Sequence, residues 1–142
     1  MLLHERDKDI ERPVVLVIDD QPAIRDMLFW TLHFQGYHPV CLANGVEALE
    51  WIENALNTHQ YPAAILLDLI MPLMNGRTFL TRLRDRWNTP DPLPPIILLS
   101  VDKNTRDDSG VYQVLLKPFH INELCACLKR VMAGPDPNVR EH

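Results

Sequence analysis

An uncharged apolar run over residues 63–67 ends at a single aspartate, Asp68. Residues that end strands and form loops follow at once, namely a Met-Pro pair, an asparagine and Gly76. A short apolar run between such signals is typical of a strand buried on both faces of a parallel sheet. Asp68 would then lie at the carboxyl end of this strand, where open α/β sheets bind their ligands. A carboxylate in that place acts as a nucleophile, a metal ligand or a strand-end cap.

Four more strands and four helices are expected along the chain. Apolar runs predict the strands, over residues 14–18, 39–43, 96–99 and 114–116. Apolar residues at helical spacing predict the helices, over about residues 22–35, 45–56, 77–87 and 121–131. Strands that alternate with helices indicate an α/β protein with right-handed crossovers and a parallel sheet covered on both faces.

Length and composition predict one domain in a reducing compartment. The 142 residues are divided into a flexible N-terminal segment (1–12), the domain (13–132) and a polar tail (133–142). A net charge of −5 argues against direct binding of nucleic acid. Three cysteines match no zinc pattern, which indicates small buried residues. No apolar run approaches the ~20 residues of a membrane span, and the start does not resemble a signal peptide. We therefore expect a cytoplasmic protein with no membrane partner.

Polar residues end four of the expected strands. They are Asp19 and Asp20, Asp68, Ser100 and Lys117. Because the carboxyl ends of parallel strands lie at one edge of the sheet, these side chains are expected to converge. Three neighbouring carboxylates repel one another, and a divalent cation such as Mg²⁺ relieves that repulsion. With a lysine and a hydroxyl beside them, the group suits phosphoryl transfer, in which one carboxylate attacks while positive charge neutralises the phosphoryl oxygens.

Four motifs, in this order, resemble those of the receiver domain of two-component response regulators. They are Val-Leu-Val-Ile-Asp19-Asp20, Leu-Leu-Asp68-Leu-Ile-Met-Pro-Leu-Met-Asn-Gly76, Ile-Leu-Leu-Ser100 and Leu-Leu-Lys117-Pro-Phe. The resemblance covers roughly residues 13–132. It implies a flavodoxin-like, doubly wound sheet with strand order 2-1-3-4-5, which the chemotaxis member of this family also has.

The resemblance also implies how the site is used. Asp68 would be the phospho-acceptor, supplied by a sensor histidine kinase or a phosphotransfer protein. Asp19 and Asp20 would hold Mg²⁺ together with Asp68 and the backbone carbonyl of Ile70. Such a domain is no enzyme in the usual sense, because it catalyses only its own phosphorylation and dephosphorylation. It would signal to an unknown downstream protein by protein–protein contact.

Two further roles are implied at the ends of the last two strands. Ser100 would be the switch hydroxyl that turns toward the phosphoryl group, and Lys117 would form an ion pair with it. The Lys-Pro bond is commonly cis in this family, so Lys117–Pro118 is expected to be cis.

The chain departs from the family pattern between Ser100 and Lys117, a segment several residues shorter than usual. Residues 102–110 hold no apolar side chain, whereas a parallel crossover usually includes a helix with one apolar face. We therefore predict that the fourth helix is missing or strongly shortened. Val114 replaces the usual aromatic residue, which favours an output face altered for a different partner or a homodimer over a degenerate one.

Two apolar residues near the acceptor also depart from the pattern. Val101 stands where the family usually has a small residue, and Ile70 where polar residues can guide an attacking water. Both would exclude water from Asp68, which predicts slow self-dephosphorylation.

Three other readings compete with a phospho-acceptor. A receiver-like docking module that works without phosphorylation would share the fold, but it typically loses an acidic residue or the lysine. A haloacid-dehalogenase-type phosphatase would need a second aspartate where Ile70 stands, and a cap domain. A flavodoxin would need a phosphate-binding loop after the first strand, where Asp19 and Asp20 stand instead.

Overall fold

The computed structural model describes residues 12–105 and 113–133, and within them five parallel strands form one sheet in the order β2-β1-β3-β4-β5. The chain runs through β1 (Val14–Ile18), α2 (Pro22–Phe34), β2 (His38–Leu42), α3 (Gly45–Thr58), β3 (Ala64–Asp68), α4 (Gly76–Arg86), β4 (Ile96–Ser100), β5 (Gln113–Leu116) and α5 (Ile121–Ala133). The predicted flavodoxin-like fold and its strand order are confirmed.

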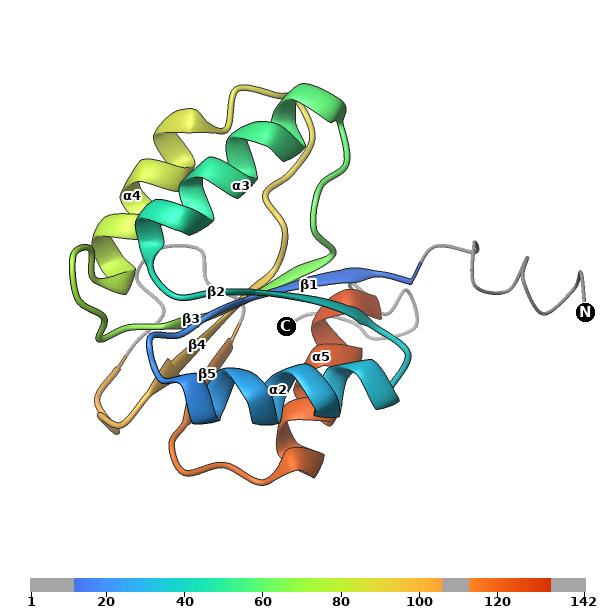
Figure 1. Ribbon diagram of the computed structural model, residues 1–142, viewed down its shortest axis with the longest axis vertical. Coiled ribbons are helices and arrows are strands. Elements are labelled where there is room, and N and C mark those ends of the chain that lie inside the picture. Colours follow the sequence, from blue (N-terminus) through green and yellow to red (C-terminus); the bar gives the residue numbers. More distant parts are fainter. Residues whose placement is uncertain (1–11, 106–112, 134–142) are drawn as a thin grey trace, which may run out of the picture.

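Helices cover both faces of the sheet (Figure 1). On one face α3 and α4 pack over alternate strand residues, including Leu16, Ile65 and Leu98. On the other face α2 and α5 pack over the intervening positions, including Val17 and Leu66. Successive residues of a strand point to opposite faces, so a strand covered on both sides must be apolar throughout. This is why β3 and β4 read as unbroken apolar runs that end in one polar residue.

The predicted helix boundaries have local causes that the structure shows. Pro22 occupies the first turn of α2, where its missing N–H costs nothing, and Gly36 follows the helix with φ +94°. Asn44 caps α3 through a bond from Glu47 N at 2.9 Å, while the Glu47 carboxylate accepts from Ala43 N. None of the helices within residues 12–105 and 113–133 is long and apolar enough to cross a membrane.

The connection from β4 to β5 agrees with the prediction of a missing or strongly shortened fourth helix. Residues 101–105 form a bend and turns, and residues 106–112, including Tyr112, lie outside the described part of the chain. The described residues of this crossover, 101–105, therefore form no helix. The predicted flexible segment 1–12, apart from Arg12, and the tail 133–142, apart from Ala133, also lie outside the described residues.

Candidate functional site

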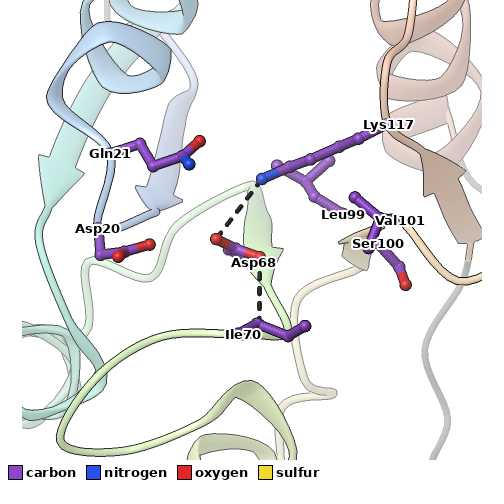
Figure 2. Close-up of a pocket in the computed structure, with 8 residues that line it drawn as sticks. All are labelled: Asp20, Gln21, Asp68, Ile70, Leu99, Ser100, Val101 and Lys117. Carbon is purple, nitrogen blue, oxygen red and sulfur yellow. Dashed lines mark hydrogen bonds and ion pairs between the residues drawn. The ribbon is translucent and has the colours of Figure 1, made fainter.

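A cleft of about 300 Å³ opens at the carboxyl ends of the strands (Figure 2). The loop after β1, the ends of β3 and β4 with residues just beyond them, and the residue after β5 form its wall. The lining residues are Asp20, Gln21, Asp68, Ile70, Leu99, Ser100, Val101 and Lys117. The predicted site residues thus lie at one edge of the sheet, because parallel pairing brings these strand ends into register.

Three carboxylates form the acidic part of the site. Asp19, Asp20 and Asp68 each offer an oxygen, and these oxygens all lie within 4.8 Å of one another. Asp19 is wholly buried and Asp68 nearly so. Burial raises the pKa of Asp68, as does the charge of Asp19, while a hydrogen bond from the Ile70 N–H and the charge of Lys117 oppose that rise. The three carboxylates therefore place repelling negative charges close together, and a bound cation would relieve that repulsion.

Lys117 places a positive charge beside two of these carboxylates. Its Nζ lies 3.2 Å from Asp19 Oδ2 and 3.5 Å from Asp68 Oδ2. Two carboxylates thus share one ammonium, which leaves net negative charge in the cleft. The Lys117–Pro118 peptide bond is cis, as the resemblance implied.

Two neighbours that the sequence did not single out hold Asp19 in place. The Gln21 N–H donates to Asp19 Oδ1 at 2.9 Å, and the Arg25 guanidinium donates to the Asp19 backbone carbonyl at 2.8 Å. Both come from the start of α2. The only signal in the sequence was the closeness of Gln21 to the acidic pair.

Gly76 lets α4 begin directly beside the end of β3. A Cβ on Gly76 would lie 2.8 Å from the Asp68 carbonyl oxygen and 2.8 Å from Leu69 Cα, both backbone atoms. Its N–H donates to the Leu69 carbonyl at 2.9 Å. Glycine is required here because the two backbones approach too closely for any side chain.

The Ser100 hydroxyl is turned away from Asp68 (Figure 2). Its Oγ lies 2.7 Å from Thr105 Oγ1 and accepts a hydrogen bond from Asp102 N at 3.0 Å. Ser100 therefore lines the cleft, but its hydroxyl does not join the cluster of charged side chains. No pattern in the sequence had singled out Thr105.

Two exposed apolar side chains flank the cleft. Ile70 follows β3 and Val101 follows β4, and they are 73% and 66% exposed. The Ile70 N–H donates to Asp68 Oδ1 at 3.2 Å. Both side chains line the cleft, so part of its rim is apolar.

The acidic group has the chemistry of a magnesium site. In proteins Mg²⁺ prefers carboxylate oxygens as ligands and keeps water molecules in its remaining positions. A bound Mg²⁺ would also relieve the repulsion among the three carboxylates. Asp19, Asp20 and Asp68 are the described residues that offer such oxygens together.

The fold and site define a flavodoxin-like α/β protein with an acidic, lysine-bearing cleft at the carboxyl edge of its sheet. The family model of the response regulator receiver domain matches residues 15–129. The chain belongs to this receiver domain family.

Curated relatives and solved structures agree with this membership. Response regulator MprA of Mycobacterium sp. (strain KMS) is 34% identical over 128 residues, which are 87% of this chain and 52% of the relative. The DNA-binding dual master transcriptional regulator RpaA of Synechocystis sp. is 32% identical over 136 residues, 92% of this chain and 54% of that protein. The chain spans about half the length of the curated relatives it matches.

Two solved receiver structures have the same fold. Chemotaxis response regulator CheY4 of Vibrio cholerae has a TM-score of 0.73 at 30% identity, covering 84% of this chain and 98% of that one. The receiver domain of sensor histidine kinase PA1611 from Pseudomonas aeruginosa has a TM-score of 0.74 at 26% identity, covering 87% of this chain and 99% of its own. That structure holds a magnesium ion in its active-site cleft.

Proposed function

We propose that this domain accepts a phosphoryl group on Asp68 from a sensor histidine kinase or a phosphotransfer protein. One observation carries the proposal. Asp68 Oδ2 lies 3.5 Å from the Lys117 ammonium, inside a group of three carboxylates whose oxygens are within 4.8 Å of one another. A nucleophilic carboxylate, a fixed cation and a place for a second cation are what phosphoryl transfer requires.

In the transfer step an Asp68 carboxylate oxygen attacks the phosphorus of the donor's phosphohistidine. An O–P bond forms as the N–P bond breaks, and the imidazole nitrogen keeps the electron pair and then takes a proton from water. Lys117 binds the transferred oxygens and neutralises part of their charge. The domain thus catalyses its own phosphorylation, and water later removes the group from Asp68.

Magnesium would be held by Asp19, Asp20 and Asp68 together with the backbone carbonyl of Ile70. When bound, it neutralises the carboxylates and the phosphoryl oxygens. The hydrogen bond from Gln21 N and that from Arg25 support this assignment, because they hold Asp19 in one position.

The proposed partners are proteins. The phosphorylated domain, over residues 13–132, would signal by protein–protein contact, to an unknown downstream partner or to a second copy of itself. The name of one relative describes it as DNA-binding, and this chain covers 54% of that protein. We propose no contact with nucleic acid or membrane for the domain itself, and we propose that it acts in the cytoplasm.

The test is incubation with acetyl phosphate and Mg²⁺, followed by measurement of the intact mass. We expect a gain of one phosphoryl group, lost on addition of EDTA beforehand and absent from Asp68→Asn. An unchanged mass would favour a docking module that works without phosphorylation. Continuous release of phosphate without a stable adduct would favour a hydrolase.

A further inference from the structure

Two hydrogen bonds hold the Ser100 hydroxyl on the side away from Asp68. Its Oγ accepts a hydrogen bond from Asp102 N at 3.0 Å and forms a hydrogen bond of 2.7 Å with Thr105 Oγ1, in which either hydroxyl can be the donor. A hydroxyl has one proton and two acceptor positions. These contacts therefore use two of the three hydrogen-bonding positions of the Ser100 hydroxyl, in a residue that is only 6% exposed.

Thr105 is itself held by the turn that follows β4. The Asp102 carboxylate accepts from Asn104 N at 2.9 Å, and the Asp102 carbonyl accepts from Thr105 N at 3.1 Å. The turn folds the chain back so that a residue five positions later faces the Ser100 hydroxyl. Thr105 is half-buried, so its bond to Ser100 is partly shielded from competing water.

Ser100 must leave both contacts if its hydroxyl is to reach a phosphoryl group on Asp68. We infer that Thr105 is a positioning residue, whose hydroxyl holds Ser100 in the turned-away rotamer and thereby sets how readily the domain adopts its phosphoryl-bound state. This inference rests on the proposed function. The hydrogen bond from Asp102 is made by its backbone N–H. Of the two contacts, only the one from Thr105 can therefore be removed by substituting a side chain.

The direction of the effect follows from a two-state equilibrium. A ligand that binds only when Ser100 is turned inward loses apparent affinity in proportion to the fraction turned away. Removing one neutral hydrogen bond from the turned-away state changes such an equilibrium by about 2- to 10-fold. Thr105→Val, which keeps the volume and removes the hydroxyl, should therefore bind phosphoryl analogues more tightly.

The first measurement needs no phosphorylation. Three-bond couplings of the Ser100 side chain report its χ1 rotamer in the free protein. We expect one rotamer in the wild type, averaging in Thr105→Val, and the wild-type value in Thr105→Ser, which restores the hydroxyl. An unchanged single rotamer in Thr105→Val would overturn the inference, whether or not Asp68 is a phospho-acceptor.

The second measurement is the affinity for beryllofluoride in the presence of Mg²⁺. We expect about 2- to 10-fold tighter binding by Thr105→Val, and no change in Thr81→Val, whose hydroxyl contacts only Arg77 O among the described residues. In a Ser100→Ala background, Thr105→Val should have no effect, because Thr105 acts through the serine. An equal effect in both backgrounds, or weaker binding by Thr105→Val, would show a merely structural role for Thr105.

The two proposals fail in different ways. If the wild type takes up no phosphoryl group from acetyl phosphate, the proposed function fails, while the rotamer measurement still decides the role of Thr105. If the wild type is phosphorylated on Asp68 and Thr105→Val leaves both the rotamer and the affinity unchanged, only the role of Thr105 fails.

Discussion

Lys117 and Asp19 form an ion pair, with 3.2 Å between Nζ and Oδ2, although they lie near opposite ends of the domain sequence. Asp19 is wholly buried, and the Lys117 side chain is 17% exposed. The pair joins the end of β1 to the residue after β5, with β3 and its Asp68 between them. Lys117 therefore offsets buried negative charge in the resting domain, and under the proposed function it also contacts the phosphoryl group.

The first prediction concerns Lys117→Met. Three carboxylates would then lie together without the ammonium of Lys117, so we expect a loss of about 1–3 kcal/mol in the free energy of unfolding in EDTA. Phosphorylation by acetyl phosphate should slow by about 100-fold, as when one preorganised donor is removed from a transition state. Urea unfolding and intact-mass time courses measure the two effects. The matched control is Lys129→Met, an exposed lysine on α5, and equal losses in both variants would contradict the account.

The second prediction concerns the pH dependence that Asp68 contributes. Its pKa is raised in the folded protein, chiefly by burial, so the folded state keeps this proton to higher pH than the unfolded state does. The stability that this proton contributes to the folded state is fully present below the pKa of Asp68 in the unfolded chain, about 3.9. It is lost as the pH rises through the pKa of Asp68 in the folded protein. Asp68→Asn should therefore unfold at a higher temperature than the wild type at pH 7 in EDTA.

The control for this prediction is Asp85→Asn, an exposed carboxylate on α4. Added Mg²⁺ should raise the unfolding temperature of the wild type and narrow its gap to Asp68→Asn, because the ion binds the folded state. If the wild type is instead more stable than Asp68→Asn in EDTA at neutral pH, repulsion among the carboxylates does not destabilise the fold, and the prediction is wrong.

The third prediction concerns Gly76→Ala. The new Cβ would meet backbone atoms of Asp68 and Leu69 at 2.8 Å, and backbone cannot move aside as a side chain can. We expect a loss of about 1–3 kcal/mol in stability and weaker Mg²⁺ binding, because the loop that must shift carries Ile70. Gly45→Ala is the comparison, since its Cβ would meet the flexible side chain of Met74 at 2.9 Å. Equal losses in the two variants would show that close backbone approach at Gly76 is unimportant.

The fourth prediction concerns the lifetime of the phosphoryl group. Ile70 and Val101 form an apolar rim on the cleft, and water excluded by it cannot attack the acyl phosphate. We expect the wild type to hold the group for minutes or longer, and Ile70→Asn to release it several-fold faster. Leu73→Asn is the control, an equally exposed residue of the same loop that does not line the cleft. A wild-type lifetime of seconds would contradict the prediction.

The sequence was enough to predict the buried strands β1, β3 and β4, because each is apolar on both faces and a polar residue ends it or follows it directly. Asp68 illustrates this, since one aspartate after an uncharged run marked both a strand end and the site. The prediction that the fourth helix is missing or strongly shortened rests on the opposite feature, because residues 102–110 offer no apolar face to pack.

The sequence could not predict contacts that depend on side-chain rotamers and on the path of a turn. Ser100 was expected among the charged groups, yet its hydroxyl bonds to Thr105, a residue with no distinguishing pattern. Arg25 likewise reaches the backbone of Asp19 from one turn into α2. Such contacts are local in space, but they leave no periodicity or motif in the chain.

The most direct test of the central claim is a crystal structure of the domain with Mg²⁺ and beryllofluoride. We expect a beryllofluoride group bound to an Asp68 oxygen and contacted by Lys117, with Mg²⁺ held by Asp19, Asp20 and Asp68. A cleft that stays empty under these conditions, with the lysine pointing away, would contradict that claim.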